Sequence, residues 1–529
     1  MTRSFHLVRP ILLATAAGIA VTAMLAPAQP AMALDCLLDT NDDGNADNNV
    51  DTDAGATSGP NSSRLACGNN AVASVTNAIA LGDTATASGA SSIAIGSYSA
   101  AVADTTTASG FGSIAIGVNS KSTASGSIAL GTDSVDAGAA GATATGVKST
   151  AIGTDASATA KHTTSLGASA SATGTSTTAL GAFSQANNQG STAVGQFART
   201  TNFNSAALGA GSLADGSAST AVGALSNAAE ARDVAMGAYA TTSGGSTGGN
   251  IAIGGTDWTS INSPDDGSYI STPSGAPTTA NGGNSIALGA SAQATGVSSM
   301  ALGGDSSDGD TLGANATGLN ATALGADSLA TAEQATALGS FSRAAGVGSI
   351  AMGGDGVDGN ALGAQALAQR SVAIGFETFA NQTNAMAIGG IAVATGGNAT
   401  ALGYQSTASG NSSTAVGSVA TAGGFLATAV GREANAGGAT ATAVGYQANA
   451  AGLGATAVGR EASASHLNAT AIGKGAATTA ANQVTLGGDG SSVRIGDIDA
   501  STAAQVGPVN AVTIDASGTL GKGAVASTS

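Results

Sequence analysis

Large side chains are scarce in this sequence of 529 residues, of which 3% are aromatic and 9% charged. A globular core of this size ordinarily rests on leucine, isoleucine and aromatic residues, whereas alanine, serine, threonine and glycine dominate here. A chain of this composition can bury only thin layers of small side chains. Its mean hydropathy of +0.21 nevertheless separates it from disordered chains, which combine low hydrophobicity with high net charge.

Basic residues are also few: 15 lysines and arginines stand against 32 acidic residues, for a net charge of −17. Nucleic-acid binding needs a basic surface, so we expect no nucleic-acid partner. The charges are sparse rather than clustered, which is typical of a charge that keeps a protein in solution.

Long apolar runs are confined to the N-terminus. Arg3 and Arg9 precede an apolar run over residues 11–25, and the small residues Ala31 and Ala33 follow at the spacing of a cleavage site. Residues 1–33 are therefore predicted to be a secretory signal peptide, and the protein to be exported. No run of 18 apolar residues follows, so we expect no transmembrane helix and no self-anchoring membrane segment.

Cysteine occurs twice, as Cys36 and Cys67. In an exported protein the simplest interpretation is one disulfide between them, which closes a loop within an acidic N-terminal segment, residues 34–76. That segment contains the first half of a calcium-loop pattern, but the twelfth position is Val50 instead of a bidentate glutamate. The pattern predicts either a weak calcium site or a solvated acidic arm, formed by Asp39, Asn41, Asp43 and Asp47.

No catalytic constellation, cofactor site or further metal site is predicted. Only His162 and His466 remain after the signal peptide, and we expect both to face solvent. Residues 353–358, Gly-Gly-Asp-Gly-Val-Asp, resemble half of a calcium-binding nonapeptide, but such sites need tandem copies. We therefore predict that the protein is not an enzyme.

A 14-residue repeat organises most of the chain. The tripeptide Ala-(Val/Ile/Leu/Met)-Gly recurs at this spacing from Gly167, where serine replaces the alanine, to Gly237, and again from Gly375 to Gly473. Within a unit such as residues 455–468, small and apolar residues recur with a period of two, which is the period of a β-strand. A glycine in every turn of a helix would cost about 1 kcal/mol each relative to alanine, so a helical interpretation is rejected.

The repeat predicts an all-β solenoid in which each unit is one coil. Two short strands face each other across a narrow interior, and consecutive coils stack as parallel strands about 4.8 Å apart. We expect the aliphatic residue before each glycine, for example Val444, to lie in that interior. A roll this thin exposes a flank of small apolar residues, which we expect to be buried against other copies of the chain.

Departures from the spacing mark insertions. The largest, residues 255–283, is predicted to be a loop that projects from the roll. Exposed aromatic residues anchor interfaces, so its Trp258 and Tyr269 are candidate ligand contacts; the alternative is that they pin the loop to the roll. Three further pairs of glycines are separated by 22-residue steps: Gly131 and Gly153, Gly303 and Gly325, and Gly353 and Gly375.

The repeat units resemble the head of the trimeric autotransporter adhesins, the YadA-like family. The likeness rests on units such as Ser285-Ile286-Ala287-Leu288-Gly289 followed by Ala292-x-Ala294-x-Gly296, and it covers residues 77–490. Residues 491–529 resemble the neck that closes such heads. The resemblance implies a left-handed parallel β-roll, a homotrimer, and attachment to an extracellular matrix protein, a host cell or another bacterial surface.

Members of this family continue into a heptad-repeat stalk and a C-terminal membrane anchor, and neither pattern is found in this sequence. The expectation is therefore a released adhesin, a fragment, or a subunit held by another protein.

The leading prediction is a non-catalytic adhesin located at the cell surface, at the outer membrane or outside the cell. The first alternative is a purely structural rod or surface-layer component without a specific receptor. Ice binding is a second alternative, because threonines at 414, 428, 442, 456 and 470 form a column with 14-residue spacing. Paired rows of threonine, which would favour ice binding more strongly, do not run throughout the repeat.

Overall fold

The computed structural model describes residues 63–97, 105–134, 141–243, 248–256, 275–306, 312–356, 362–494, 496, 502, 504–506, 509–516 and 518–523. Two compact units are distinguished, residues 1–183 and 184–529, and each is described by itself. In both units the repeat forms parallel β-strands, three residues and two residues long in alternation. The prediction of an all-β parallel solenoid with 14-residue coils is confirmed.

The first unit contains β1 (Leu65–Cys67), β2 (Val72–Ala73), β3 (Ile79–Leu81), β4 (Thr86–Ala87), β5 (Ile93–Ile95), β6 (Thr107–Ala108), β7 (Ile114–Ile116), β8 (Lys121–Ser122), β9 (Ile128–Leu130), β10 (Thr143–Ala144), β11 (Thr150–Ile152), β12 (Ser157–Ala158), β13 (Thr164–Leu166), β14 (Ser171–Ala172) and β15 (Thr178–Leu180).

The second unit begins with β16 (Gln185–Ala186), β17 (Thr192–Val194), β18 (Arg199–Thr200), β19 (Ala206–Leu208), β20 (Leu213–Ala214), β21 (Thr220–Val222), β22 (Asn227–Ala228), β23 (Val234–Met236), β24 (Thr241–Thr242), β25 (Ile251–Ile253), β26 (Thr279–Ala280), β27 (Ile286–Leu288), β28 (Gln293–Ala294), β29 (Met300–Leu302), β30 (Asn315–Ala316), β31 (Thr322–Leu324), β32 (Leu329–Ala330), β33 (Thr336–Leu338), β34 (Arg343–Ala344) and β35 (Ile350–Met352).

It continues with β36 (Gln365–Ala366), β37 (Val372–Ile374), β38 (Phe379–Ala380), β39 (Met386–Ile388), β40 (Val393–Ala394), β41 (Thr400–Leu402), β42 (Thr407–Ala408), β43 (Thr414–Val416), β44 (Thr421–Ala422), β45 (Thr428–Val430), β46 (Asn435–Ala436), β47 (Thr442–Val444), β48 (Asn449–Ala450), β49 (Thr456–Val458), β50 (Ser463–Ala464), β51 (Thr470–Ile472), β52 (Val484–Leu486), β53 (Ala511–Ile514) and β54 (Leu520–Gly523).

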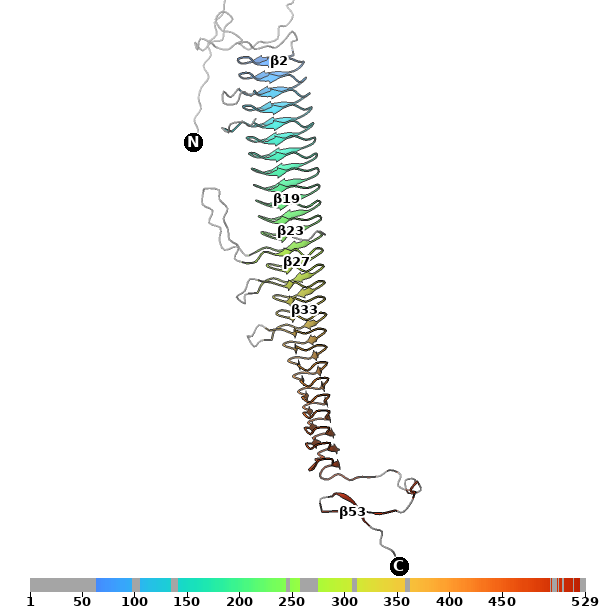
Figure 1. Ribbon diagram of the computed structural model, residues 1–529. Coiled ribbons are helices and arrows are strands. Elements are labelled where there is room, and N and C mark those ends of the chain that lie inside the picture. Colours follow the sequence, from blue (N-terminus) through green and yellow to red (C-terminus); the bar gives the residue numbers. More distant parts are fainter. Residues whose placement is uncertain are drawn as a thin grey trace, which may run out of the picture. The chain divides into compact units, whose positions relative to one another are not determined.

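Coils stack in register, so that equivalent residues form columns. In the second unit β47 pairs in parallel with β49, which places Thr442 beside Thr456 and Val444 beside Val458. The two-residue strands β48 and β50 pair in the same way. Figure 1 shows this stacking within the second unit, for example from β19 to β33.

The two turns of a coil share one geometry. In the coil 455–468, the N–H of Ala462 donates to the carbonyl oxygen of Gly459 at 3.2 Å, and an equivalent bond closes the second turn. The third residue of each turn is left-handed, with φ of 58° at Glu461 and 52° at Asn468. This conformation costs most residues about 1–2 kcal/mol but is tolerated by asparagine, which often occupies the second turn.

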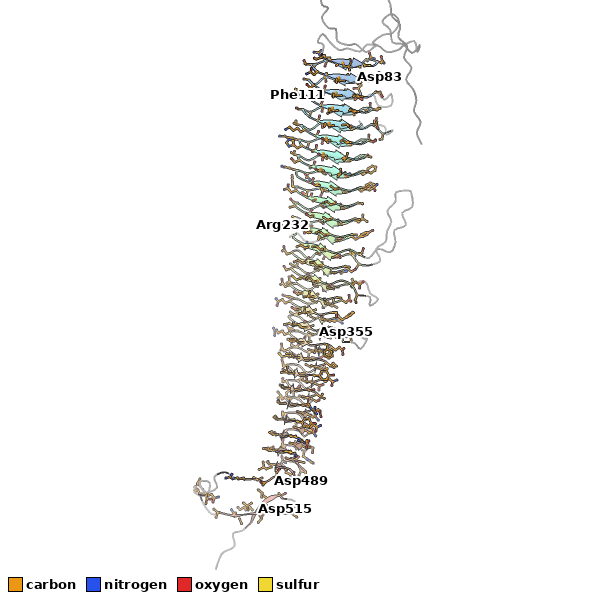
Figure 2. All side chains as sticks on the ribbon, turned by 180° about the vertical axis from the view of Figure 1, so that it is seen from behind. Asp83, Phe111, Arg232, Asp355, Asp489 and Asp515 are labelled. Carbon is orange, nitrogen blue, oxygen red and sulfur yellow. The ribbon has the colours of Figure 1, made fainter. Side chains whose placement is uncertain are left out.

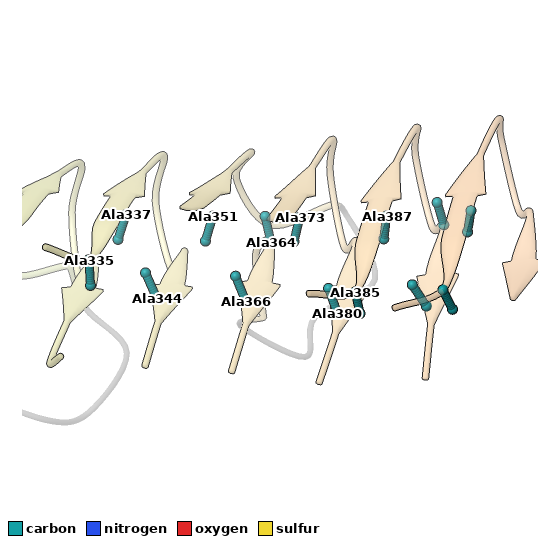
Figure 3. Packing of buried hydrophobic residues seen from close by; sticks show 14 of the residues in the cluster. Ala335, Ala337, Ala344, Ala351, Ala364, Ala366, Ala373, Ala380, Ala385 and Ala387 are labelled. Carbon is teal, nitrogen blue, oxygen red and sulfur yellow. The ribbon is translucent and has the colours of Figure 1, made fainter. Parts of the chain in front are cut away.

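Alanine fills the interior. In the same coil Ala455, Ala457, Ala462 and Ala464 are all 0% exposed. Figure 3 shows equivalent alanines, among them Ala337 and Ala344, in the space between the two rows of strands. The two rows of such a short coil lie so close together that little more than a Cβ atom fits from each side.

The prediction that Val444 lies inside the roll was wrong. Its neighbour Ala443 is fully buried, whereas Val444 is 36% exposed. Successive side chains of a strand point to opposite faces, so burial of the alanine turns the valine outward. Period-two alternation alone does not say which of the two sets is inside, and here the narrow interior selects the smaller side chain.

The repeat glycine is required by both conformation and space. Gly445 has φ of 133°, and a Cβ atom added there would lie 2.6 Å from the carbonyl oxygen of Gly459 in the next coil. Glycine adopts such angles without steric cost. The glycine column therefore lets the backbones of successive coils stack closely at one edge.

One ladder of buried polar side chains lies where the spacing of coils is irregular. Asp233 is fully buried, and its carboxylate accepts the backbone N–H groups of Glu230 at 3.1 Å and Asn250 at 2.8 Å. The buried Oδ1 of Asn250 accepts the backbone N–H and the hydroxyl of Ser285 at 3.1 and 2.9 Å. This ladder joins three consecutive coils between Gly223 and Gly289.

Among the described residues the coils begin at β1, ahead of the predicted boundary at residue 77. Cys67 there occupies the place of the aliphatic residue before glycine, so the tripeptide pattern does not recognise this coil. Within the predicted insertion 255–283, β26 pairs with β24 and β28 and so belongs to the coils.

Within the neck-like segment 491–529, β53 and β54 form an antiparallel hairpin. Among the described residues, no helix has the length and apolar character needed to cross a membrane. The predicted signal peptide, residues 1–33, lies outside those residues.

Candidate functional surface

Within each unit, the last residue of each three-residue strand points outward, and we call these residues the aliphatic column. It is an isoleucine, leucine, valine or methionine in every such strand from β3 to β51. These side chains are partly exposed in the single chain, for example 36% at Val444 and 43% at Leu402. A row of partly exposed aliphatic groups is a candidate interaction surface.

The first residue of each three-residue strand also points outward. Its residue type differs between regions, so the width of the apolar surface differs too. In the first unit it is isoleucine in β3, β5, β7 and β9, which are paired in succession. In the second unit it is threonine from β41 to β51, again in register. The column is therefore flanked by a second aliphatic column in one region and by hydroxyl groups in the other.

A second surface lies on the turn that follows the repeat glycine. The residue directly after the glycine is Tyr404, Arg432, Tyr446 or Arg460 in four coils of the second unit, and we call these residues the Arg/Tyr strip. Arg432 donates a hydrogen bond from Nη2 to the Oη of Tyr446 at 3.0 Å, and its guanidinium carbon lies 4.8 Å from the centre of that ring.

Acidic neighbours partly balance the charge of the strip. Arg432 contacts the carboxylate of Glu433 at 3.0 Å, and Arg460 contacts that of Glu461 at 2.9 Å. The hydrogen bond with Tyr446, followed by the charge of Glu433, raises the pKa of Arg432 above its ordinary value. Both arginine side chains remain about 60% exposed, so the strip presents aromatic, cationic and anionic groups together to solvent.

Most of the residues singled out from the sequence lie outside the described residues: Cys36, Asp39, Asn41, Asp43, Asp47, Trp258 and Tyr269. Cys67 is half-buried at the end of β1. Its predicted disulfide partner, Cys36, lies outside the described residues, so this disulfide stays a prediction. His162 is exposed, and His466 is partly exposed with Nδ1 3.2 Å from the hydroxyl of Ser465. In the described part of the chain, no group of three or more histidine, cysteine or acidic side chains is placed to hold a metal ion.

Sequence reasoning missed both surfaces, although the signals were present. The aliphatic column was recognised as a repeat but assigned to the wrong face. The Arg/Tyr strip could have been found by aligning the coils, because its members are separated by multiples of the repeat length. The contact of Arg432 with Tyr446 follows only once the parallel register is known.

Comparison with known proteins identifies the repeat. The family model for the YadA head domain repeat (2 copies) matches residues 65–83, 76–99, 108–134, 144–170, 172–198, 280–306, 316–342, 330–355, 366–392, 394–420, 422–448 and 450–476, more than half of the chain. No curated protein sequence matches the chain.

Among solved structures, the chain is similar to the collagen-binding domain of the Yersinia adhesin YadA, with 20% identity, 38% of this chain and 82% of that chain covered, and a TM-score of 0.22. A likeness at this level adds nothing to the assignment, which rests on the repeated family match and on the coils themselves. The chain belongs to the YadA head domain repeat family.

Proposed function

We propose that the protein is a non-catalytic adhesin, exported to the cell surface or the medium, that attaches to an extracellular matrix protein, a host cell or another bacterium. The observation that carries this proposal is the presence of head repeats of an adhesin family over more than half of the chain. The outward columns support it, because a solenoid of this kind presents many similar groups in a row. Weak contacts repeated in this way gain strength through avidity.

We further propose that the working form is a homotrimer in which the aliphatic column is buried. Burial of aliphatic surface contributes about 25 cal/mol per Å², and the column offers a contact in every coil. The double variant Val444→Asp with Val458→Asp places two carboxylates in that contact. Sedimentation should give a trimer for the native protein at micromolar concentration and a smaller species for the variant.

The control for this variant changes the outward residues of the two-residue strands, Asn435→Asp with Asn449→Asp. These residues lie on another face of the same coils and bond to each other at 3.1 Å. The control should remain trimeric. A stable native monomer, or equal dissociation of both variants, would contradict the proposed interface.

Ligand contact is proposed for the outer surface, at the Arg/Tyr strip and at the segment that carries Trp258 and Tyr269. The test measures attachment of the trimer to collagen, fibronectin, host cells and bacteria of the same kind. One variant combines Arg432→Ala, Tyr446→Ala and Arg460→Ala, and another deletes residues 257–274 and thereby retains β26. The matched control replaces Asn435, Asn449 and Ser463 by alanine.

We expect at least one of the two surface variants to lose most of the attachment while the control keeps it. Retained attachment in both variants would place the contact elsewhere on the coils. Failure of the intact trimer to attach to any surface would favour the alternative of a purely structural rod.

A further inference from the structure

Three oxygen-bearing side chains stack on one another where the first insertion, between Gly131 and Gly153, leaves and rejoins the coils. Asn119, Asp133 and Asp155 occupy the second position after the repeat glycine in consecutive coils of the first unit. The N–H of Asp133 bonds to the carbonyl oxygen of Val118 in the coil before it, at 3.1 Å, and that of Asp155 to Thr132, at 3.3 Å. These bonds hold the three residues one above another, with about 4.8 Å between coils.

The contacts within this stack bring the polar groups together. Asn119 Nδ2 donates to Asp133 Oδ2 at 2.9 Å, so the amide group faces the carboxylate. The backbone N–H of Ser134, the residue after Asp133, donates to Asp155 Oδ1 at 3.1 Å. Two carboxylates thus lie on neighbouring coils, where their like charges repel each other.

Two oxygen atoms of the stack are buried without a hydrogen-bond partner. They are Oδ1 of Asn119 and Oδ1 of Asp133, and the Asn119 side chain is 0% exposed. A buried acceptor without a partner costs about 1–3 kcal/mol. Carboxylate and amide oxygens are the ligands that calcium takes in proteins, completed by backbone carbonyls and water.

We propose that Asn119, Asp133 and Asp155 bind one divalent cation, Ca²⁺. The ion supplies the missing partner of both orphaned oxygens and removes the repulsion between the two carboxylates. Ca²⁺ is favoured over Mg²⁺ because it accepts irregular sets of six to eight oxygen ligands, whereas Mg²⁺ demands a near-ideal octahedron.

The other two 22-residue steps provide an internal comparison. Each places an acidic residue at the same turn position in two consecutive coils, Asp305 with Asp327 and Asp355 with Glu377. The residue stacked before each pair is Ser291 or Phe341 in place of Asn119. Figure 2 shows Asp355 and Arg232 on opposite edges of the second unit. Asp355 Oδ1 is also buried without a partner. The residue stacked before Asp355 is Phe341, however, so this position lacks the third oxygen ligand that Asn119 provides.

The experiment titrates the mature chain, residues 34–529, with CaCl2 by calorimetry and follows thermal unfolding with and without Ca²⁺. We expect one site with a dissociation constant on the order of 10⁻⁴–10⁻³ M, as in weak extracellular calcium modules, and no comparable effect of MgCl2. Asp133→Asn and Asn119→Gly should each weaken binding at least about tenfold. Glycine keeps the left-handed turn, since Asn119 has φ of 56°.

Two controls decide between sites. Asp355→Asn removes the equivalent carboxylate from a stack that has Phe341 in place of Asn119. It should leave the calcium affinity unchanged. The triple change of Asp39, Asp43 and Asp47 to asparagine tests the N-terminal segment and should also leave it unchanged. Absence of calcium binding by the native chain overturns the proposal, as does binding that survives Asp133→Asn in a variant with native circular dichroism. Loss of binding in either control overturns it as well.

Discussion

The coils at 420–476 and the coils at 92–127 have the same backbone conformation but different interiors. In the first region every buried side chain belongs to alanine. In the second, hydroxyl groups take several of the same positions, at Ser92, Thr106, Ser113, Ser120, Ser122 and Ser127. The buried alanines of the first unit accordingly form separate clusters, one ending at Ala115 and the next beginning at Ala129.

The difference teaches what the fold demands of its interior, which is small volume rather than apolar character. Each turn offers a carbonyl oxygen three residues before the inner position. Ser120 donates to Gly117 at 3.0 Å and Ser127 to Ala124 at 2.7 Å. A buried hydroxyl satisfied in this way carries little penalty. The hydroxyls of Ser92 and Ser113 have no hydrogen-bond partner among the described residues, so serine replaces alanine even where its hydroxyl is not satisfied.

The largest effect is expected where a charge enters the alanine-only interior. Ala443→Asp buries a carboxylate without a partner and should lower the free energy of unfolding by about 3–5 kcal/mol, measured by urea denaturation. Val444→Asp changes the adjacent, outward residue and should cost clearly less in the same assay at a concentration where the chain is monomeric. Equal losses would break the assignment of inner and outer faces. Asp233 shows the exception, because two backbone N–H groups donate to its buried carboxylate.

Substitution of a repeat glycine should cost the same stability in both regions, whichever side chains fill the interior. Gly445→Ala and Gly117→Ala each place a Cβ atom within 2.6 and 2.2 Å of the next coil's carbonyl oxygen, at φ of 133° and 121°. Each should cost about 2–3 kcal/mol in thermal or urea unfolding. Similar losses sharpen the comparison by confining the difference between the regions to the side chains. A tolerated substitution at either site contradicts the close stacking of coils.

Exchange of hydroxyl and methyl groups should produce a smaller, asymmetric effect. Ser127→Ala removes a bond to Ala124 and one to the hydroxyl of Ser122, 2.6 Å away, and should cost about 1 kcal/mol. Ala441→Ser adds a hydroxyl at the equivalent inner position, and its cost should stay within about 0.5 kcal/mol. Urea unfolding of both variants tests this directly. A large loss of stability for Ala441→Ser would show that this interior requires alanine.

The smallest expected effect is a gain in stability. Val419 is a β-branched residue with φ of 59°, which is a strained combination, whereas Asn119 occupies the equivalent turn position in the other region. Val419→Asn should raise the free energy of unfolding by about 1 kcal/mol. A higher melting temperature is the expected readout, and a lower one would show that the valine side chain stabilises the coil or the proposed trimer.

The fold could be predicted from the sequence because the 14-residue period of the sequence equals the length of one coil. The register of parallel strands, the turns and the stacking all follow from the regular recurrence of the repeat glycine. The face assigned to Val444 was wrong because alternation identifies two faces without naming the buried one. Cys67 concealed the first coil for a related reason, since a pattern of aliphatic residues excludes cysteine at a position where cysteine fits.

The candidate surfaces were harder to predict than the fold. Contacts such as Arg432 with Tyr446 join equivalent residues of successive coils and become visible only in register. The stack of Asn119, Asp133 and Asp155 depends in addition on a 22-residue step, which breaks the spacing in the sequence while the coils remain adjacent. Local patterns therefore describe single coils well and describe columns across interrupted coils poorly.

The in-register pairing of coils also sets how such a unit responds to force. Hydrogen bonds between coils run along the stacking direction, so tension in that direction loads them a coil at a time instead of shearing many together. Each 14-residue coil that detaches extends to about 48 Å in place of about 4.8 Å of stack. A pulled unit would lengthen in discrete steps from its ends, absorbing work while its remaining coils stay folded.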